Sequence, residues 1–165
     1  MKIKSKDIFL SWDFVIAIIL TLATYALLPS TLQLEFCKSF YNIGITVLSI
    51  VFSLFFAALA IIMASPDNDF INFMEEEGDF TDLLYRFKFV LITLFISLIY
   101  SIVLFVMTEY KLSTLHVQTG AQHFIFFLVF EFLFSYSLIA TLLSVDDTIK
   151  FSKFRARFIS NKNRN

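Results

Sequence analysis

One carboxyl group, that of Glu131, lies inside an otherwise apolar run, HFIFFLVFEFLFSYSLIATLL, which extends from residue 123 to residue 143. A carboxyl group at that depth in a lipid bilayer costs about 2.5–3.5 kcal/mol on insertion scales, so Glu131 is expected to face protein or water. Three other apolar runs carry polar side chains at a similar depth. These side chains are Thr21, Thr24, Ser49, Ser53, Ser97, Tyr100 and Ser101. The pattern predicts a polar layer near the middle of the membrane.

Two interpretations of this polar layer remain open. In the first, Glu131 lines a path for an ion or a proton, alone or as part of a ring in an oligomer. In the second, Glu131 is a protonated or hydrogen-bonded carboxyl group that locks helix packing with Ser53, Ser97 or Tyr100. The third apolar run also carries small polar residues at a spacing of four, and such stripes usually serve helix packing.

A second group of charged residues lies outside the apolar runs. Residues 65–86, SPDNDFINFMEEEGDFTDLLYR, hold seven of the fourteen carboxylates of the chain, and residues 144–165 hold six basic side chains. Glu75, Glu76 and Glu77 are predicted to end a short helix, where the helix dipole disfavours anions, so a cation should compensate them. The predicted partner-binding residues are Asp69, Glu75, Glu76, Glu77, Asp79, Asp82, Lys150, Lys153, Arg155 and Arg157.

Apolar side chains are interleaved with these charges at helical spacing. In the acidic segment, Phe70, Phe73 and Met74 share one helical face. In the basic tail, the residues near one face are Ile149, Phe151, Phe154 and Phe158. The tail is therefore either an amphipathic interfacial helix that rests on anionic lipid, or a helix that docks against the acidic segment or a cytoplasmic protein partner.

The motifs of common enzymes and cofactor sites are missing from the sequence. The single cysteine, Cys37, permits no disulfide within the chain and no thiolate metal cluster. His116 and His123 are expected near the outer face. Two histidines seven residues apart are only weak evidence for a metal site. There is no glycine-rich phosphate loop and no serine nucleophile elbow. We expect no enzymatic activity, no cofactor, no metal site and no direct binding of nucleic acid.

The hydrophobic pattern predicts an all-α membrane protein with four transmembrane helices and one transmembrane domain over residues 1–165. The chain is 58% apolar, above the 45–50% or so of soluble domains. The predicted spans are about 8–28, 43–64, 87–107 and 123–143, each close to the 20 or so residues that cross a hydrocarbon core. Within 65–86, Pro66, Gly78 and Asp79 predict two short helices, the second continuing directly into the third span.

Basic residues predict the orientation of these spans. Eleven of the thirteen lysines and arginines fall in the N-terminal residues, in or next to the acidic segment, or in the tail, whereas Lys38 and Lys111 fall on the other side. By the positive-inside rule, both termini and residues 65–86 should be cytoplasmic, as in a multi-pass protein of the bacterial inner membrane.

This layout resembles the small four-span inner-membrane proteins of bacterial phage-defence systems. The features that carry the resemblance are the basic ends, the spans 43–64 and 87–107 around SPDNDFINFMEEEGDFTDLLYRFK, and the short outer loops. The membrane subunit of the Kiwa system is similar in size and span count, and the membrane protein of the Rex exclusion system has a comparable plan. The resemblance implies a homo-oligomer that senses or alters the membrane during infection together with a cytoplasmic partner.

Two other functions fit the same sequence. One is a membrane anchor or scaffold that has no pore and recruits a cytoplasmic protein through residues 65–86 and the basic tail. The other is a small ion channel or transporter unrelated to defence, which would need a polar path from one face of the membrane to the other.

Overall fold

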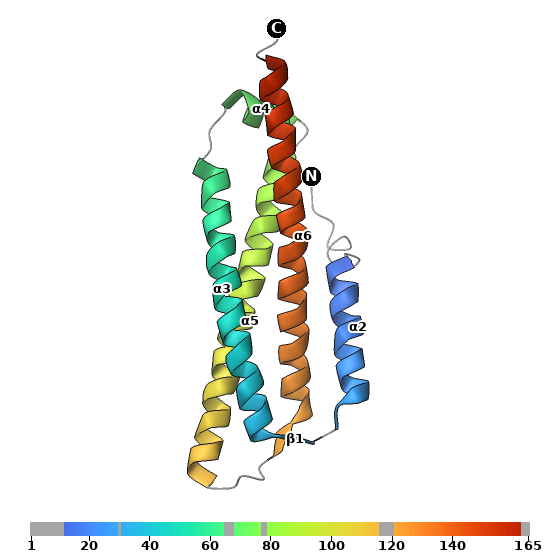
Figure 1. The fold of residues 1–165 in the computed structure, drawn as a ribbon, viewed down its shortest axis with the longest axis vertical. Coiled ribbons are helices and arrows are strands. Elements are labelled where there is room, and N and C mark those ends of the chain that lie inside the picture. The colour runs from blue at the N-terminus through green and yellow to red at the C-terminus, as the bar shows by residue number, and fades with distance from the viewer. Residues whose placement is uncertain (1–11, 30, 65–67, 77–78, 116–120, 163–165) are drawn as a thin grey trace.

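The computed structural model describes residues 12–29, 31–64, 68–76, 79–115 and 121–162. These residues form a helical structure with the elements α2 (Trp12–Leu27), β1 (Thr31–Gln33), α3 (Leu34–Ala64), α4 (Asn68–Glu76), α5 (Asp79–Leu115), β2 (Ala121–His123) and α6 (Phe124–Lys162). The long helices run side by side along one axis (Figure 1). The prediction of a helical protein is therefore confirmed, although a small sheet adds to it.

Three helices, α3, α5 and α6, are long and apolar enough to cross a membrane. The described part of α2 is a shorter apolar helix, and the predicted first span, 8–28, lies partly outside the described residues. At 1.5 Å per residue, α5 (37 residues) and α6 (39 residues) are roughly 55–60 Å long. A hydrocarbon core is only about 30 Å thick. Both helices therefore extend beyond any membrane that they cross.

The loops predicted at 29–42 and 108–122 are shorter than expected, because helices occupy much of them. α3 begins at Leu34, and α5 continues to Leu115. Between these helices and their neighbours, β1 and β2 pair as antiparallel strands, with Leu32 opposite Gln122. Thr108 also donates a hydrogen bond to Gln122, and an ion pair joins Lys38 to Glu109. The connections at this end of the molecule are thus tied together.

The helices form an open layer in which α6 lies between α2 and α5, while α3 packs mainly on α5 (Figure 1). One buried cluster lies near the strands and includes Tyr41, Leu104, Phe127 and Phe130. A second cluster lies further along and includes Leu48, Phe55, Phe87, Val90, Leu94 and Ala140. At Gly44 an added Cβ would lie only 2.5 Å from Cζ of Phe130, so this glycine permits the close approach of α3 to α6.

The other end of the molecule is a compact unit that we call the head: α4, residues 79–86 of α5 and residues 144–162 of α6. The predicted pair of short helices is confirmed, since α4 ends at Glu76 and α5 begins at Asp79 and runs without a break into the apolar segment. Gly78, the predicted stop, lies outside the described residues. The basic tail continues α6 along its axis as far as Lys162 instead of turning to form a separate interfacial helix (Figure 1).

Candidate functional site

The site around Glu131 is built by two helices, α2 and α6. Ser135, one turn further along α6, donates a hydrogen bond of 2.9 Å to Oε1 of Glu131. Oγ1 of Thr21 on α2 lies 3.2 Å from Oε2 of the same carboxyl group. Glu131 is partly buried in this position. The four oxygens of these three side chains therefore link the two helices through polar contacts within the apolar part of the bundle.

Aromatic rings hold α2 against α6 on either side of this contact. Phe14 meets Phe132 edge to face, with ring centroids 5.7 Å apart, and also meets Tyr136 at 6.1 Å. Near the strands, Tyr25 packs against Phe124 at 5.9 Å. Aromatic side chains therefore flank the carboxyl group along α2 and α6. Its polar neighbours are Thr21 on α2 and Ser135 on its own helix.

The side chains of the predicted polar layer do not form one connected group in the structure. Oγ of Ser97 lies 2.6 Å from Oγ of Ser137, in the contact between α5 and α6. Ser101 donates to the carbonyl of Tyr41, and Tyr100 donates to the carbonyl of Phe126. Ser53 is exposed and donates to the carbonyl of Ser49 on its own helix. The depth count located these residues along the membrane, but it carried no information about which helix face they occupy.

Sequence reasoning named neither of the two groups that contact Glu131 as its partner, because it proposed Ser53, Ser97 or Tyr100. Thr21 was among the residues at matching depth, and it does contact the carboxyl group. Ser135 was overlooked, although it follows Glu131 by four residues and must share its face of α6. The relevant signal was therefore the local i, i+4 spacing on the same helix.

In the head, phenylalanine rings join α4 to α6. The ring of Phe70 is almost completely buried and lies 5.3 Å from Phe151 and 5.4 Å from Phe158. Phe73 packs on Phe154 and Phe158. These rings lie on the apolar faces that the sequence indicated for the acidic segment and the tail. The basic tail thus contacts the acidic segment through its apolar side chains.

The acidic end of α4 is stabilised in a way that the sequence did not predict. Both carboxylate oxygens of Glu75 accept hydrogen bonds from Thr81, one from its backbone N–H at 3.2 Å and one from its hydroxyl group at 2.7 Å. Glu75 therefore caps the start of α5, where the helix dipole favours an anion. The expected compensating cation is not needed for this carboxylate. Glu77 and the side chain of Asp79 lie outside the described residues.

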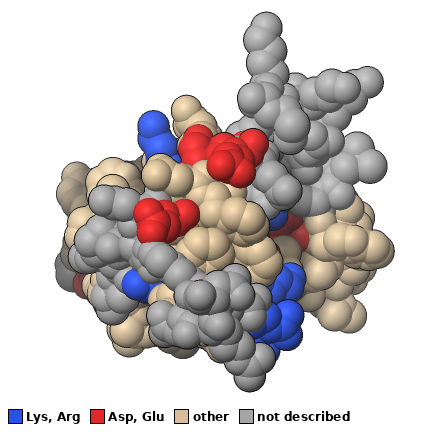
Figure 2. Space-filling model, turned by 90° about the horizontal axis from the view of Figure 1, so that it is seen from above, with Lys and Arg blue, Asp and Glu red and all other residues tan. Residues whose placement is uncertain are grey.

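Ion pairs in the head involve the end of α6. Arg86 on α5 pairs with Asp147 at 3.4 Å, and Lys150 pairs with Asp146 and Asp147 on its own helix. The hydrogen bond to Asp146 and its negative charge raise the pKa of Lys150. Viewed from this end, acidic and basic side chains are both spread over the same face (Figure 2). The remaining predicted partner-binding side chains are exposed or partly exposed: Asp69, Glu76, Asp82, Lys153, Arg155 and Arg157.

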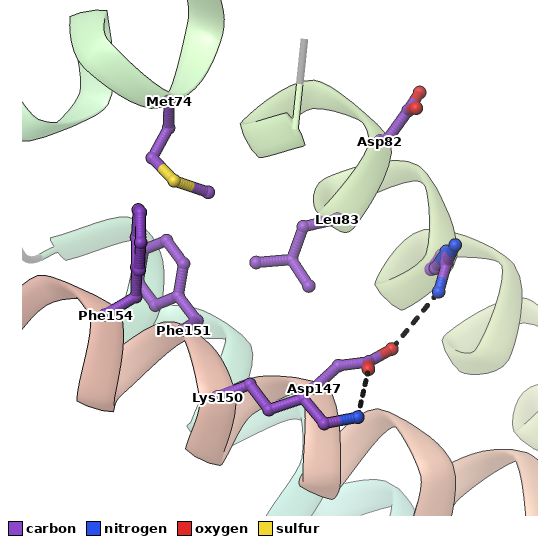
Figure 3. Close-up of a pocket in the computed structure, with 8 residues that line it drawn as sticks. Met74, Asp82, Leu83, Asp147, Lys150, Phe151 and Phe154 are labelled. Carbon is purple, nitrogen blue, oxygen red and sulfur yellow. Dashed lines mark hydrogen bonds and ion pairs between the residues drawn. The ribbon is translucent and has the colours of Figure 1, made fainter. Parts of the chain in front are cut away.

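A groove of about 370 Å³ opens among α4, α5 and α6 in the head. Its apolar wall is formed by Met74, Leu83, Phe151 and Phe154. Its polar rim is formed by Asp82, Arg86, Asp147 and Lys150. Figure 3 shows Met74 and Leu83 pointing toward the two phenylalanine rings, while Asp82 points away from them. The groove combines a small apolar surface with charges of both signs, which suits a protein surface better than a small metabolite.

Metal ligands are not clustered in the described part of the chain, where no group of three or more His, Cys, Asp or Glu side chains could hold an ion. Cys37 is buried, and burial keeps its thiol away from solvent.

Comparison with protein families, with curated proteins and with solved structures finds no match to this chain. The function of this chain is therefore inferred from its own sequence and geometry.

Proposed function

We propose that this chain is the membrane-embedded subunit of a bacterial anti-phage defence system. In this proposal, four helices cross the inner membrane, both termini and the head face the cytoplasm, and several copies assemble. The subunit senses or perturbs the membrane together with a cytoplasmic protein partner. The basic ends and the short outer connections support this orientation, and the layout resembles that of other small defence membrane proteins.

The observation that carries the proposal is the continuity of α5 and α6 between the apolar bundle and the head. Each helix runs from one part to the other without a loop (Figure 1). A protein bound at the charged rim of the head therefore acts directly on two helices that are long enough to cross the membrane. This continuity gives a cytoplasmic event a mechanical route to the bilayer.

The proposal is tested by phage plating in cells that express the chain with the genes encoded beside it. The wild-type chain should lower plating efficiency and change the membrane potential after infection. Reversing two exposed basic side chains of the head, Lys153→Glu with Arg157→Glu, should abolish both effects, because the partner surface changes sign. Lys111→Glu, at the opposite end of the molecule, is the matched control and should leave both effects in place. Equal plating with and without the wild-type chain would reject a role in defence.

A membrane anchor without a pore is the second candidate, and one observation favours it. Glu131 is hydrogen-bonded within the chain, and Ser97 and Ser137 contact each other between helices. These hydroxyl groups serve helix packing in one copy of the chain. Glu131→Ala separates the two candidates: it should alter the change in membrane potential if the bundle conducts, and leave it unaltered if the chain only recruits a partner. A potential change without protection against phage would instead indicate a channel unrelated to defence.

A further inference from the structure

The oxygens around Glu131 contain fewer hydrogens than their contacts require if the carboxyl group is ionised. Oγ1 of Thr21 lies 2.9 Å from the carbonyl oxygen of Ala17 and 3.2 Å from Oε2 of Glu131. A threonine hydroxyl has one hydrogen and can donate to one of these acceptors at a time. Whenever this hydrogen is given to Ala17, the shorter of the two contacts, Oγ1 of Thr21 and Oε2 of Glu131 face each other at 3.2 Å without a hydrogen between them.

A proton on Glu131 completes this set of contacts. Oε2 then donates to Oγ1 of Thr21, and Thr21 donates to the carbonyl of Ala17. Ser135 donates to Oε1, which remains an acceptor. Each of the contacts then contains one hydrogen, and the chain of hydrogen bonds passes from α6 to α2. Buried polar groups in proteins are normally satisfied in this way.

The described helices supply no cation to pair with Glu131. No lysine, arginine or histidine occurs in residues 12–27 of α2, 39–64 of α3, 89–110 of α5 or 124–149 of α6. The other ionisable groups on these stretches are Asp13, Tyr25, Tyr41, Tyr100, Glu109, Tyr110, Tyr136, Asp146 and Asp147, together with the buried Cys37 that precedes the α3 stretch. All of them are neutral or negative, so they add no positive charge. An ionised carboxyl group within an apolar bundle is costly when no cation pairs with it.

We propose that Glu131 is a proton-binding site within the membrane, where the bound proton bridges α6 to α2 through Thr21. The proton comes from water and returns to water, and no other bond forms or breaks. α2 packs mainly against α6, so the state of this carboxyl group controls a polar contact between these two helices. The inference rests on the membrane placement of these helices and not on the role in defence.

The test uses dicyclohexylcarbodiimide on the full-length protein in phospholipid vesicles at pH 7. The O–H group of a protonated carboxyl adds across one C=N bond of this apolar reagent to give an O-acylisourea, which then rearranges to a stable N-acylurea. Peptide mass spectrometry should find the adduct on Glu131, and its yield should fall as the pH of the buffer rises. Exposed carboxyl groups of the head, such as Asp69 and Glu76, are the internal control and should not be labelled. An unlabelled Glu131 at pH 7 would overturn the proposal.

Glu131→Gln is the matched variant, because its amide group can donate to Thr21 and accept from Ser135 as the protonated acid does. The adduct should be lost from this position, while the thermal midpoint in detergent should equal that of the wild type at pH 7. Glu131→Ala removes both hydrogen bonds and should lower the midpoint. A midpoint for Glu131→Gln as low as that of Glu131→Ala would contradict the proton bridge.

A bound sodium ion is the alternative that the same experiment excludes. Labelling is compared in sodium chloride and in choline chloride at equal concentration. Equal yields support a proton as the ligand, whereas protection by sodium would show that the site holds a monovalent cation and would overturn the proposal. None of these measurements involves phage, so their outcome is separate from that of the plating assay.

Discussion

In the bundle, α5 and α6 meet at a pair of hydroxyl groups, those of Ser97 and Ser137, whereas in the head α4 and α6 meet through phenylalanine rings around Phe70. In the proposed membrane placement, this difference follows from the solvent around each region, lipid for the bundle and water for the head. Lipid tails are as apolar as the side chains, so helices in a membrane associate through close packing and hydrogen bonds. In water, the burial of apolar area supplies the driving force. The two regions should therefore respond to different substitutions.

The largest effect is expected for Phe70→Ala in the head. Removing a buried phenylalanine typically costs about 3–5 kcal/mol, and an isolated nine-residue helix such as α4 is marginal in water. The substitution should detach α4 while the bundle stays folded. Hydrogen exchange of the backbone amides of residues 69–76 measures this opening. Phe73→Ala is the matched control and should have a smaller effect, because 43% of the surface of Phe73 is exposed. Equal exchange in the two variants would mean that burial does not hold the head together.

A moderate effect is expected in the bundle for the pair Ser97→Ala and Ser137→Ala. Hydrogen bonds between membrane helices average about 0.6 kcal/mol, with a maximum near 1.7 kcal/mol. The coupling between the two substitutions should fall in that range in a double-mutant cycle of unfolding in detergent. Ser53→Ala is the control, since Ser53 is exposed and bonds only to its own helix. A coupling energy of zero would show that packing alone joins α5 to α6.

The smallest effect is expected for the ion pair between Arg86 and Asp147. The side chain of Arg86 is 69% exposed, and exposed pairs usually contribute about 0.2–1 kcal/mol and weaken as salt rises. Arg86→Ala should raise amide exchange in the head only slightly at low ionic strength and not at all at high salt. Lys153→Ala offers a control, as an exposed basic residue further along the tail. A large effect that survives high salt would place this pair among the main contacts of the head.

The sequence predicted helices best where the signals were local. Pro66 and Gly78 marked the limits of α4, and residue periodicity marked its apolar face. Hydropathy detected the apolar parts of α3 and α5 but not their polar extensions, because LEFCKSFYN from residue 34 is helical without being apolar. The pairing of β1 with β2 joins residues about 90 positions apart, and no local pattern announces such a contact.

For the site around Glu131, depth could be counted from the sequence, but rotation about the helix axis could not. The count put Thr21 and Ser97 at a similar depth to Glu131, but only Thr21 contacts the carboxyl group, whereas Ser97 contacts Ser137. Which faces of four helices meet depends on packing throughout the bundle, including the close approach at Gly44. The capping of α5 by Glu75 was hidden for the same reason, since it required the path of the chain between α4 and α5.

The paired strands β1 and β2 hold two connections together at one end of the bundle. They join the connection between α2 and α3 to the connection between α5 and α6. Helices that are joined at one end can separate most at the opposite end. The end opposite the strands is the head, where α4 spans the ends of α5 and α6 (Figure 1). In the proposed membrane placement, a small change of helix tilt would therefore displace the head, which carries the proposed partner surface, more than the end near the strands.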